Sequence, residues 1–198
     1  MAPPCDANIR LNRRRGCGMC VPRVNASTIK TADSIALLCP TCALCCNGVL
    51  FADVRLQKGD DDARLAALGL PLKRRATLPR FSQPCACLNG KLCQIYAERP
   101  VRCRTFECRL LQRTGAGEIT EAAALKSIQK AHRCADRVRN ILRELGDHDE
   151  SIPLSRRYQR MMRQAIDLSA DEHQIDLRGQ LMMVVADLVG ELDRNFLR

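Results

Sequence analysis

Four cysteines stand within eight residues of the chain, in the stretch Cys39-Pro40-Thr41-Cys42-Ala43-Leu44-Cys45-Cys46. Disulfide bonds among them would close loops of only a few residues, and disulfide geometry requires Cα separations and Cβ directions that such loops do not provide. Two residues between cysteines instead allow a tight turn to direct both sulfur atoms toward one metal ion. The stretch therefore indicates metal–thiolate chemistry.

A second group of cysteines follows further along the chain, at Cys85, Cys87, Cys93, Cys103 and Cys108. In the first group, the adjacent residues Cys45 and Cys46 point in different directions, so they suit two metals, or one metal and one bridge. The candidate metal ligands are Cys39, Cys42, Cys45, Cys46, Cys85, Cys93, Cys103 and Cys108. These cysteines are enough for two sites of four ligands each.

The spacing of the first three cysteines leaves the identity of the metal open. C-x2-C-x2-C is the spacing of [4Fe–4S] ferredoxins, whose fourth ligand is more distant. Ferredoxins place a proline after that fourth cysteine, whereas here Pro40 follows the first. Four-cysteine zinc sites also use C-x2-C pairs, and ligand softness does not choose between zinc and iron. The expected cofactor is zinc or iron, with a [4Fe–4S] cluster among the alternatives.

The cysteine count and the absence of targeting signals favour a reducing compartment. Thirteen cysteines cannot all pair, because the number is odd. The basic run 13–15 is not followed by the apolar stretch of a signal peptide, and the apolar run 181–185 is too short to span a bilayer. We therefore expect a cytoplasmic protein without a membrane segment, where cysteine clusters are more often metal sites than disulfide frameworks.

The formal net charge of +10 has two interpretations. A basic N-terminus and the run Lys73-Arg74-Arg75 would suit nucleic acid. Ligated cysteines are thiolates, however, so a basic surplus also compensates an anionic cluster. Aromatic residues make up only 3% of the chain, which leaves few side chains to stack on bases. Metal ions are thus the expected partners, and nucleic-acid binding is disfavoured.

Hydrophobic periodicity predicts a mainly α-helical protein with a small, irregular, cysteine-organised core and short strands at most. Helices are expected over about 60–68, 120–145, 154–168 and 177–197, with Asp60–Asp62 capping the first and Gly146 ending the second. Short strands are expected near 49–56 and 93–96. The core should be rich in Leu, Ala, Val and Met, because tryptophan is absent.

We expect three segments along the chain: a poorly structured basic arm (1–34), a cysteine-cluster domain with its packing helix (35–146) and a C-terminal helical segment (147–198). The C-terminal helices offer a surface for a protein partner. The arm contains Cys5 and the pair Cys17 and Cys20, which is half a zinc site that His132 and Cys134 would complete from a distance. The alternative is a flexible arm with free thiols.

The remaining chemistry-bearing residues are assigned structural roles. The stripe Met161, Met162, Leu181, Met182 and Met183 is expected to pack in the core. The three histidines, His132, His148 and His173, are isolated in the sequence and expected at the surface of helices or loops. No Ser/His/Asp arrangement supports hydrolysis, and no glycine-rich cofactor loop follows a strand.

Taken together, the motifs resemble the YkgJ-type cysteine-cluster family, a bacterial group associated with zinc or iron chelation through a CxxCxxCC motif. The resemblance covers roughly residues 36–145. It is carried by Cys39-x2-Cys42-x2-Cys45-Cys46, Pro84-Cys85-Ala86-Cys87-Leu88, Cys93-Gln94-Ile95-Tyr96 and Arg99-Pro100-x2-Cys103-Arg104. It implies that Cys39, Cys42, Cys45, Cys46, Cys85, Cys93 and Cys103 are ligands, joined by Cys108.

Two residues depart from the pattern of this family. Ala43 stands where the family often has glycine, and Cys87 stands where the family usually has another residue, which leaves Cys87 between an extra ligand and a buried thiol. Arg99 and Arg104 are expected to donate to the thiolates and neutralise them. The predicted function is a metal-binding protein; an iron–sulfur enzyme and a nucleic-acid adaptor are the alternatives. The resemblance to the cysteine cluster of flagellin lysine methylases favours iron–sulfur as the metal but does not imply methyltransferase activity.

Overall fold

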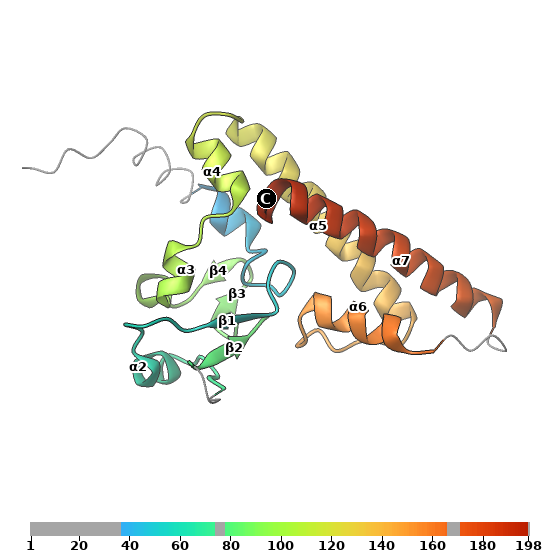
Figure 1. Cartoon of the computed structure of the whole chain (residues 1–198), viewed down its shortest axis with the longest axis horizontal. Helices are drawn as coiled ribbons and strands as arrows, with labels where there is room; N and C mark the ends of the chain where they lie inside the picture. Colours follow the sequence, from blue (N-terminus) through green and yellow to red (C-terminus); the bar gives the residue numbers. More distant parts are fainter. Residues whose placement is uncertain (1–36, 74–77, 166–170, 198) are drawn as a thin grey trace, which may run out of the picture.

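A computed structural model describes residues 37–73, 78–165 and 171–197 of the chain (Figure 1). Within these residues the fold is mainly helical, and the strands form two short antiparallel pairs. The prediction of a mainly α-helical protein with short strands is confirmed. The N-terminal arm, with Cys5, Cys17 and Cys20, lies outside the described residues.

The cysteine-rich part of the chain is built from short elements. After a helical turn over residues 37–42 come β1 (Asp53–Arg55), α2 (Asp62–Ala67), β2 (Arg80–Ser82), β3 (Leu88–Asn89), β4 (Leu92–Cys93), the 3-10 helix η1 (Tyr96–Glu98) and α3 (Val101–Thr105). The β1–β2 pair sets Val54 opposite Phe81. The predicted strand at 93–96 is reduced to β4, and Tyr96 is helical instead.

The rest of the described chain consists of longer helices. They are α4 (Arg109–Gly115), α5 (Glu121–Glu144), α6 (Leu154–Arg163), α7 (Glu172–Leu192) and the π-helical turn η2 (Asp193–Leu197). Helices α5 and α7 run side by side along the molecule, and the C-terminal end of α7 lies next to α4 (Figure 1). Thr120 caps α5 by accepting from the Ala123 N–H at 3.2 Å, and Gly146, with φ 85°, follows its end.

Two clusters of buried apolar side chains form the core. The smaller one lies under α2 and the β1–β2 pair and contains Val54, Leu56, Leu65, Leu70, Phe81 and Cys87. The larger one lies between α4, α5, α6, α7 and η2 and also includes Leu38, Leu44 and Val49 from the cysteine stretch. The first cysteine motif is therefore packed on the helical core rather than on the sheets.

Two expectations about individual side chains are wrong. Met161 and Leu181 are buried, as predicted, but Met162, Met182 and Met183 are 43%, 57% and 70% exposed. Adjacent residues of a helix lie about 100° apart, so neighbours in the sequence cannot all face the same core. His132 is half-buried rather than exposed, because it faces the cysteine motif.

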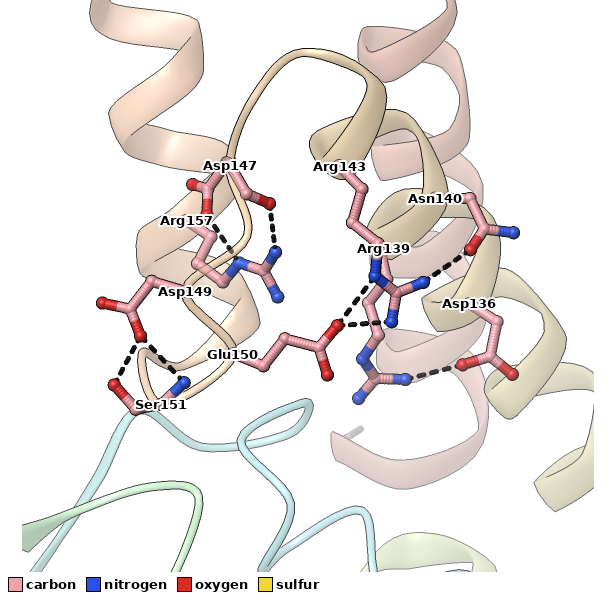
Figure 2. Close-up of polar contacts among 9 residues, drawn as sticks. All are labelled: Asp136, Arg139, Asn140, Arg143, Asp147, Asp149, Glu150, Ser151 and Arg157. Atoms are coloured by element: carbon pink, nitrogen blue, oxygen red, sulfur yellow. Dashed lines mark hydrogen bonds and ion pairs between the residues drawn. The ribbon is translucent and has the colours of Figure 1, made fainter.

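A buried ion pair fixes the connection between α5 and α6. The Arg157 guanidinium donates from Nε to Asp147 Oδ1 at 3.1 Å and from Nη2 to the Asp147 carbonyl at 2.7 Å, and both residues are buried (Figure 2). Arg160 donates to the second carboxylate oxygen of Asp147 at 2.7 Å.

None of the described helices has the length and apolar character that crossing a membrane requires.

Candidate metal centre

The first cysteine motif folds into a tight turn around Ala43. This residue has φ 52°, in the left-handed region, and its carbonyl accepts from the N–H groups of Cys46 and Asn47, both at 2.9 Å. Its own N–H donates to the Cys39 carbonyl at 3.1 Å. Glycine reaches positive φ without steric cost, which explains physically why glycine suits this position. The turn gathers the four cysteines of residues 39–46 into one short loop.

Contacts from distant segments hold this loop in place. The ring nitrogen Nε2 of His132, on α5, is hydrogen-bonded to the Cys42 carbonyl at 2.8 Å. The Cys85 N–H donates to the Cys46 carbonyl at 2.8 Å, and the side chain of Leu44 is buried in the helical core. The loop is thus tied to α5 on one side and to the second cysteine group on the other.

The second cysteine group is positioned by caps and turns. Asp60 accepts from the Val101 N–H at the start of α3, at 2.7 Å, and from the Gln57 N–H, also at 2.7 Å. Cys103 lies on α3, which begins after Pro100, and Cys108 is the residue that precedes α4. The hairpin β3–β4 ends at Cys93. Short elements separated by turns therefore direct these thiols to one side.

The thiols surround one cavity of about 750 Å³. Seven of the eight predicted ligands line it: Cys39, Cys42, Cys45, Cys46, Cys93, Cys103 and Cys108. Cys85 does not line it directly but is hydrogen-bonded to Cys46 through the backbone. All ten described cysteines are free thiols, so no disulfide bond competes with metal binding within this part of the chain.

The thiols influence one another's pKa values in two sets that are joined by Cys46. The pKa of Cys39 is raised to about 11 and that of Cys42 to about 12, mainly by burial, and the neighbouring Cys108 contributes to both shifts. The pKa of Cys45 is raised by burial and then by Cys42 and Cys108. The first group therefore comprises Cys39, Cys42, Cys45 and Cys108, which we call group A.

The remaining predicted ligands influence one another in the same way. The pKa of Cys103 is raised to about 12, mainly by burial, and the nearby thiols Cys46 and Cys93 contribute to the shift. The pKa of Cys85 is likewise raised to about 12, mainly by burial, with contributions from Cys87, Cys46 and Cys93. The second group comprises Cys46, Cys85, Cys93 and Cys103, which we call group B. Cys46 also influences group A, so the two groups are adjacent.

Backbone N–H groups point at three of the thiols and favour their thiolate forms. The Leu44 N–H donates to Cys42, the Cys87 N–H donates to Cys85, and the N–H groups of the first turn of α4 donate to Cys108. Hydrogen bonds to the charged form lower a pKa, although burial outweighs them for these three thiols. Such N–H donors are typical of metal–thiolate sites, where they stabilise the sulfur charge.

Arg99 is the basic residue most closely associated with the thiols. Its guanidinium lies 3.6 Å above the Tyr96 ring, and its Nε donates to the Tyr96 carbonyl at 2.9 Å. Burial dominates the pKa of Cys46, and the charge of Arg99 opposes it, as it does for Cys39 and Cys103. Arg104 lines the same cavity. Both predicted arginines are therefore beside the thiols, and Arg99 is the one that acts on both groups.

The described cysteines form a donor set that suits a thiophilic metal, but their side chains are not close enough together to complete a coordination sphere. Within the described residues, no three His, Cys, Asp or Glu side chains are already gathered closely enough to hold an ion. Seven cysteines around one cavity, with Cys85 beside them and N–H donors directed at three of the sulfurs, are chemically suited to zinc or iron. Binding would require small side-chain movements and the release of thiol protons.

Two described cysteines take other positions. The Cys87 thiol is buried and donates to the Leu68 carbonyl at 3.5 Å, in the small core under α2. Cys134 is buried in the helical core and accepts from Arg137 at 3.5 Å. A site that combines Cys134 with Cys17 and Cys20 falls partly outside the described residues.

Sequence reasoning missed the positioning roles of His132 and Asp60. His132 follows the buried Ala131 and lies four residues after the buried Ile128, so the helical period already placed it at the edge of the packed face. The predicted cap within Asp60–Asp62 is confirmed, because Asp61 accepts from the Arg64 N–H at 2.9 Å, whereas Asp60 reaches away from α2 to the Val101 N–H. Neither tertiary contact has a local signal that would identify its partner.

Comparison with known families agrees with this site. Residues 38–135 match the family model named CxxCxxCC, described as a "putative zinc- or iron-chelating domain". Comparisons with curated proteins and with solved structures gave no match. The matched range contains all eight cysteines of groups A and B. Through residues 38–135, the chain belongs to the CxxCxxCC family.

Proposed function

We propose that the protein binds metal at two adjacent four-thiolate centres, one formed by group A and one by group B. The observation that carries the proposal is the gathering of seven cysteines around one cavity, with the eighth, Cys85, hydrogen-bonded to Cys46 through the backbone. The adjacent residues Cys45 and Cys46 belong to different sets, as expected for neighbours whose side chains diverge. Four thiolates complete a tetrahedral zinc site or hold one iron–sulfur cluster.

The bound metals would serve first as cross-links. Group A would connect the loop 39–46 to the start of α4, and group B would connect that loop to β4, to α3 and to the segment at Cys85. These segments contain few residues in regular structure. When bound, zinc would supply structural stability alone, whereas an iron–sulfur cluster would also supply electron transfer.

Arg99 and Arg104 are proposed to balance the charge of the loaded centres. Eight thiolates carry more negative charge than two divalent ions neutralise, so nearby cations lower the free energy of the loaded state. Arg99 is held over Tyr96 at the border between the groups. Replacement of Arg99 by Gln should therefore weaken metal retention. The measurement is the chelator concentration that removes half of the metal. The same replacement of Arg163, which is exposed and lies outside the cavity, is the matched control.

Anaerobic purification followed by metal and acid-labile sulfide analysis tests this function. Two zinc ions without sulfide, or iron with sulfide and a broad visible absorption, would each support metal binding and would identify the metal. Protein that folds and contains neither metal after growth with both would refute the proposal.

A further inference from the structure

Helix α7 carries a continuous seam of apolar residues on the side that faces away from the core. The seam, which we call the outer seam, consists of Ile175, Gly179, Met182, Ala186 and Val189. Met182 is 57% and Val189 is 42% exposed, and Gly179 and Ala186 are also exposed. We propose that the outer seam binds the outer seam of a second copy of the chain, with the two helices antiparallel.

The opposite side of α7 is apolar as well. Leu177, Leu181, Val185 and Leu188 are buried there in the helical core, where α5 and α6 pack on α7 (Figure 1). A helix that is apolar on two opposite sides is normally buried on both, because water disfavours contact with apolar surface. Within the described residues only one of these sides is covered, so the outer seam is open to a second molecule.

The spacing of the outer seam is that of helices that pair along their length. Its residues follow one another at intervals of four, three, four and three, which is the heptad period of coiled coils. At a rise of about 1.5 Å per residue, the seam extends over roughly 21 Å, or about four helical turns. A second helix can therefore stay in contact with the seam from one end to the other.

Large and small residues of the outer seam complement each other in an antiparallel pair. A two-fold axis beside Met183, which is 70% exposed, sets Gly179 opposite Val189 of the second copy. The same axis sets Met182 opposite Ala186 of the second copy. A Cβ atom added to Gly179 would meet nothing within 4 Å, so the space in front of this glycine is open to a larger side chain. The symmetric interface thus packs each large residue against a small one.

The N-terminal end of the outer seam is acidic. Glu172 and Asp176 are exposed, and within the described residues neither forms an ion pair. Anionic lipid headgroups would be repelled by these carboxylates, whereas helices that lie on membranes carry lysine and arginine on their polar face. The charge at this end therefore favours a protein partner that presents a cation.

The C-terminal end of the outer seam presents such a cation. The side chain of Arg194 is 67% exposed, and it shares the buried carboxylate of Glu191, at 3.5 Å, with Lys130, which is closer at 2.7 Å. The neighbouring Asp193 takes part in an interaction within its own chain. In the antiparallel pair, Arg194 of one copy lies level with Glu172 of the other, and the symmetry repeats this contact. A parallel pair would instead set like charges side by side.

Sedimentation equilibrium of the full chain, as purified, tests the proposal. We expect a reversible monomer–dimer equilibrium whose dissociation constant rises roughly tenfold or more in Met182→Glu, because the interface would then contain an unpaired charge. Met162→Glu makes the same change at a methionine of α6 that is 43% exposed and should leave the dissociation constant unchanged. Melting curves by circular dichroism check that both variants are folded.

An exchange of charges tests the orientation of the two helices. Glu172→Arg should weaken the dimer several-fold, because it sets two arginines level with each other across the interface. The double variant Glu172→Arg with Arg194→Glu should recover the affinity, since it restores opposite charges at the same contact. Weakening without recovery in the double variant would contradict the antiparallel arrangement.

Two results would overturn the proposal as a whole. The first is a wild-type chain that stays monomeric as its concentration is raised, and the second is a dimer that Met182→Glu leaves unchanged, since its interface would lie elsewhere. In a monomer, slow oxidation of Met182 and Met183 by hydrogen peroxide would show that the chain itself covers the seam. Binding of a monomer to anionic vesicles that Met182→Glu abolishes would assign the seam to a membrane instead.

Discussion

The cysteine-rich region, residues 37–108, and the helical region, residues 109–197, are stabilised by different means. In the first, the strands have two or three residues and the longest named helix, α2, has six. In the second, α5 has 24 residues and α7 has 21, and they pack on each other along their length. Long helices with a continuous apolar face can fold by packing alone, whereas short elements around a cavity need cross-links. The contrast suggests that metal is a structural requirement of the first region only.

Removal of the metal should produce the largest difference between the two regions. A structural thiolate site contributes on the order of 10 kcal/mol to the folding of the segments that it joins. After chelation, amide hydrogen exchange should therefore become fast in residues 50–108 and stay slow in the centres of α5 and α7. Equal loss of protection in both regions, or in neither, would contradict the comparison.

A substitution in the helical region should lower stability without changing the metal content. Arg157→Leu leaves the buried Asp147 with only Arg160 as a partner, so we expect a loss of about 3–5 kcal/mol in the free energy of unfolding. Denaturant unfolding measures the loss, and metal content measured under native conditions should stay unchanged. The more exposed Arg160, changed to Leu, is the matched control and should cost less. A variant that loses metal but keeps its helices would show that the regions are not independent.

Alkaline pH should destabilise the cysteine-rich region in the metal-free protein. Burial raises the thiol pKa values from the ordinary 9.0, to about 12 for Cys42 and Cys103. A raised pKa contributes stability that is fully present below 9.0 and is lost as pH rises toward the folded value. Near-ultraviolet circular dichroism should follow this loss. An unchanged signal above pH 9.0 would show that the thiols are not buried.

Acid should act on the helical region instead. Burial alone would raise the pKa of Asp147, but the hydrogen bond from Arg160 and the charge of Arg157 lower it below the ordinary 3.8. The stability that this ion pair contributes is thus present above 3.8 and is lost as pH falls through the lowered pKa. In the metal-loaded protein, acid also protonates the thiolates and should release metal at a higher pH than the helices unfold. Helix unfolding that precedes metal release would contradict this order.

Ala43→Gly should give the smallest effect, and a favourable one. Ala43 has φ 52°, where a Cβ atom is strained, and its substitution by glycine removes that strain at the cost of a more flexible unfolded chain. We expect a gain of up to about 1 kcal/mol in the cysteine-rich region, visible as a higher chelator concentration for half-removal of metal. A clear loss of stability would show that the turn has a different backbone conformation.

The sequence predicted the helical region better than the cysteine-rich one. The period of apolar residues and the Thr120 and Gly146 signals located α5 within one residue at each end, because these signals act through the helix backbone itself. The expected helix over 154–168 was too long: α6 ends at Arg163, and residues 166–170 lie outside the described chain. The prediction that the methionine stripe is buried was wrong in part, because it combined neighbours in the sequence, which face different sides of a helix.

In the cysteine-rich region, the residue types were predictable and their grouping was not. Thiol spacing identified the candidate ligands, but the association of Cys108 with Cys39 and of Cys46 with Cys103 depends on how distant segments pack. The hydrogen bond between His132 and the Cys42 carbonyl joins residues 90 apart in the sequence. No local propensity encodes such a contact, so only the three-dimensional arrangement reveals it.

Native mass spectrometry of anaerobically prepared Cys108→Ser and Cys103→Ser proteins tests the central claim most directly. Cys108 belongs to group A and Cys103 to group B, so each variant should lose one metal centre and keep the other. Cys134→Ala, which changes a buried thiol of the helical core outside both groups, should keep two. Simultaneous loss of all metal in both single variants, with the helices intact, would show that the eight cysteines form one centre and would contradict the account.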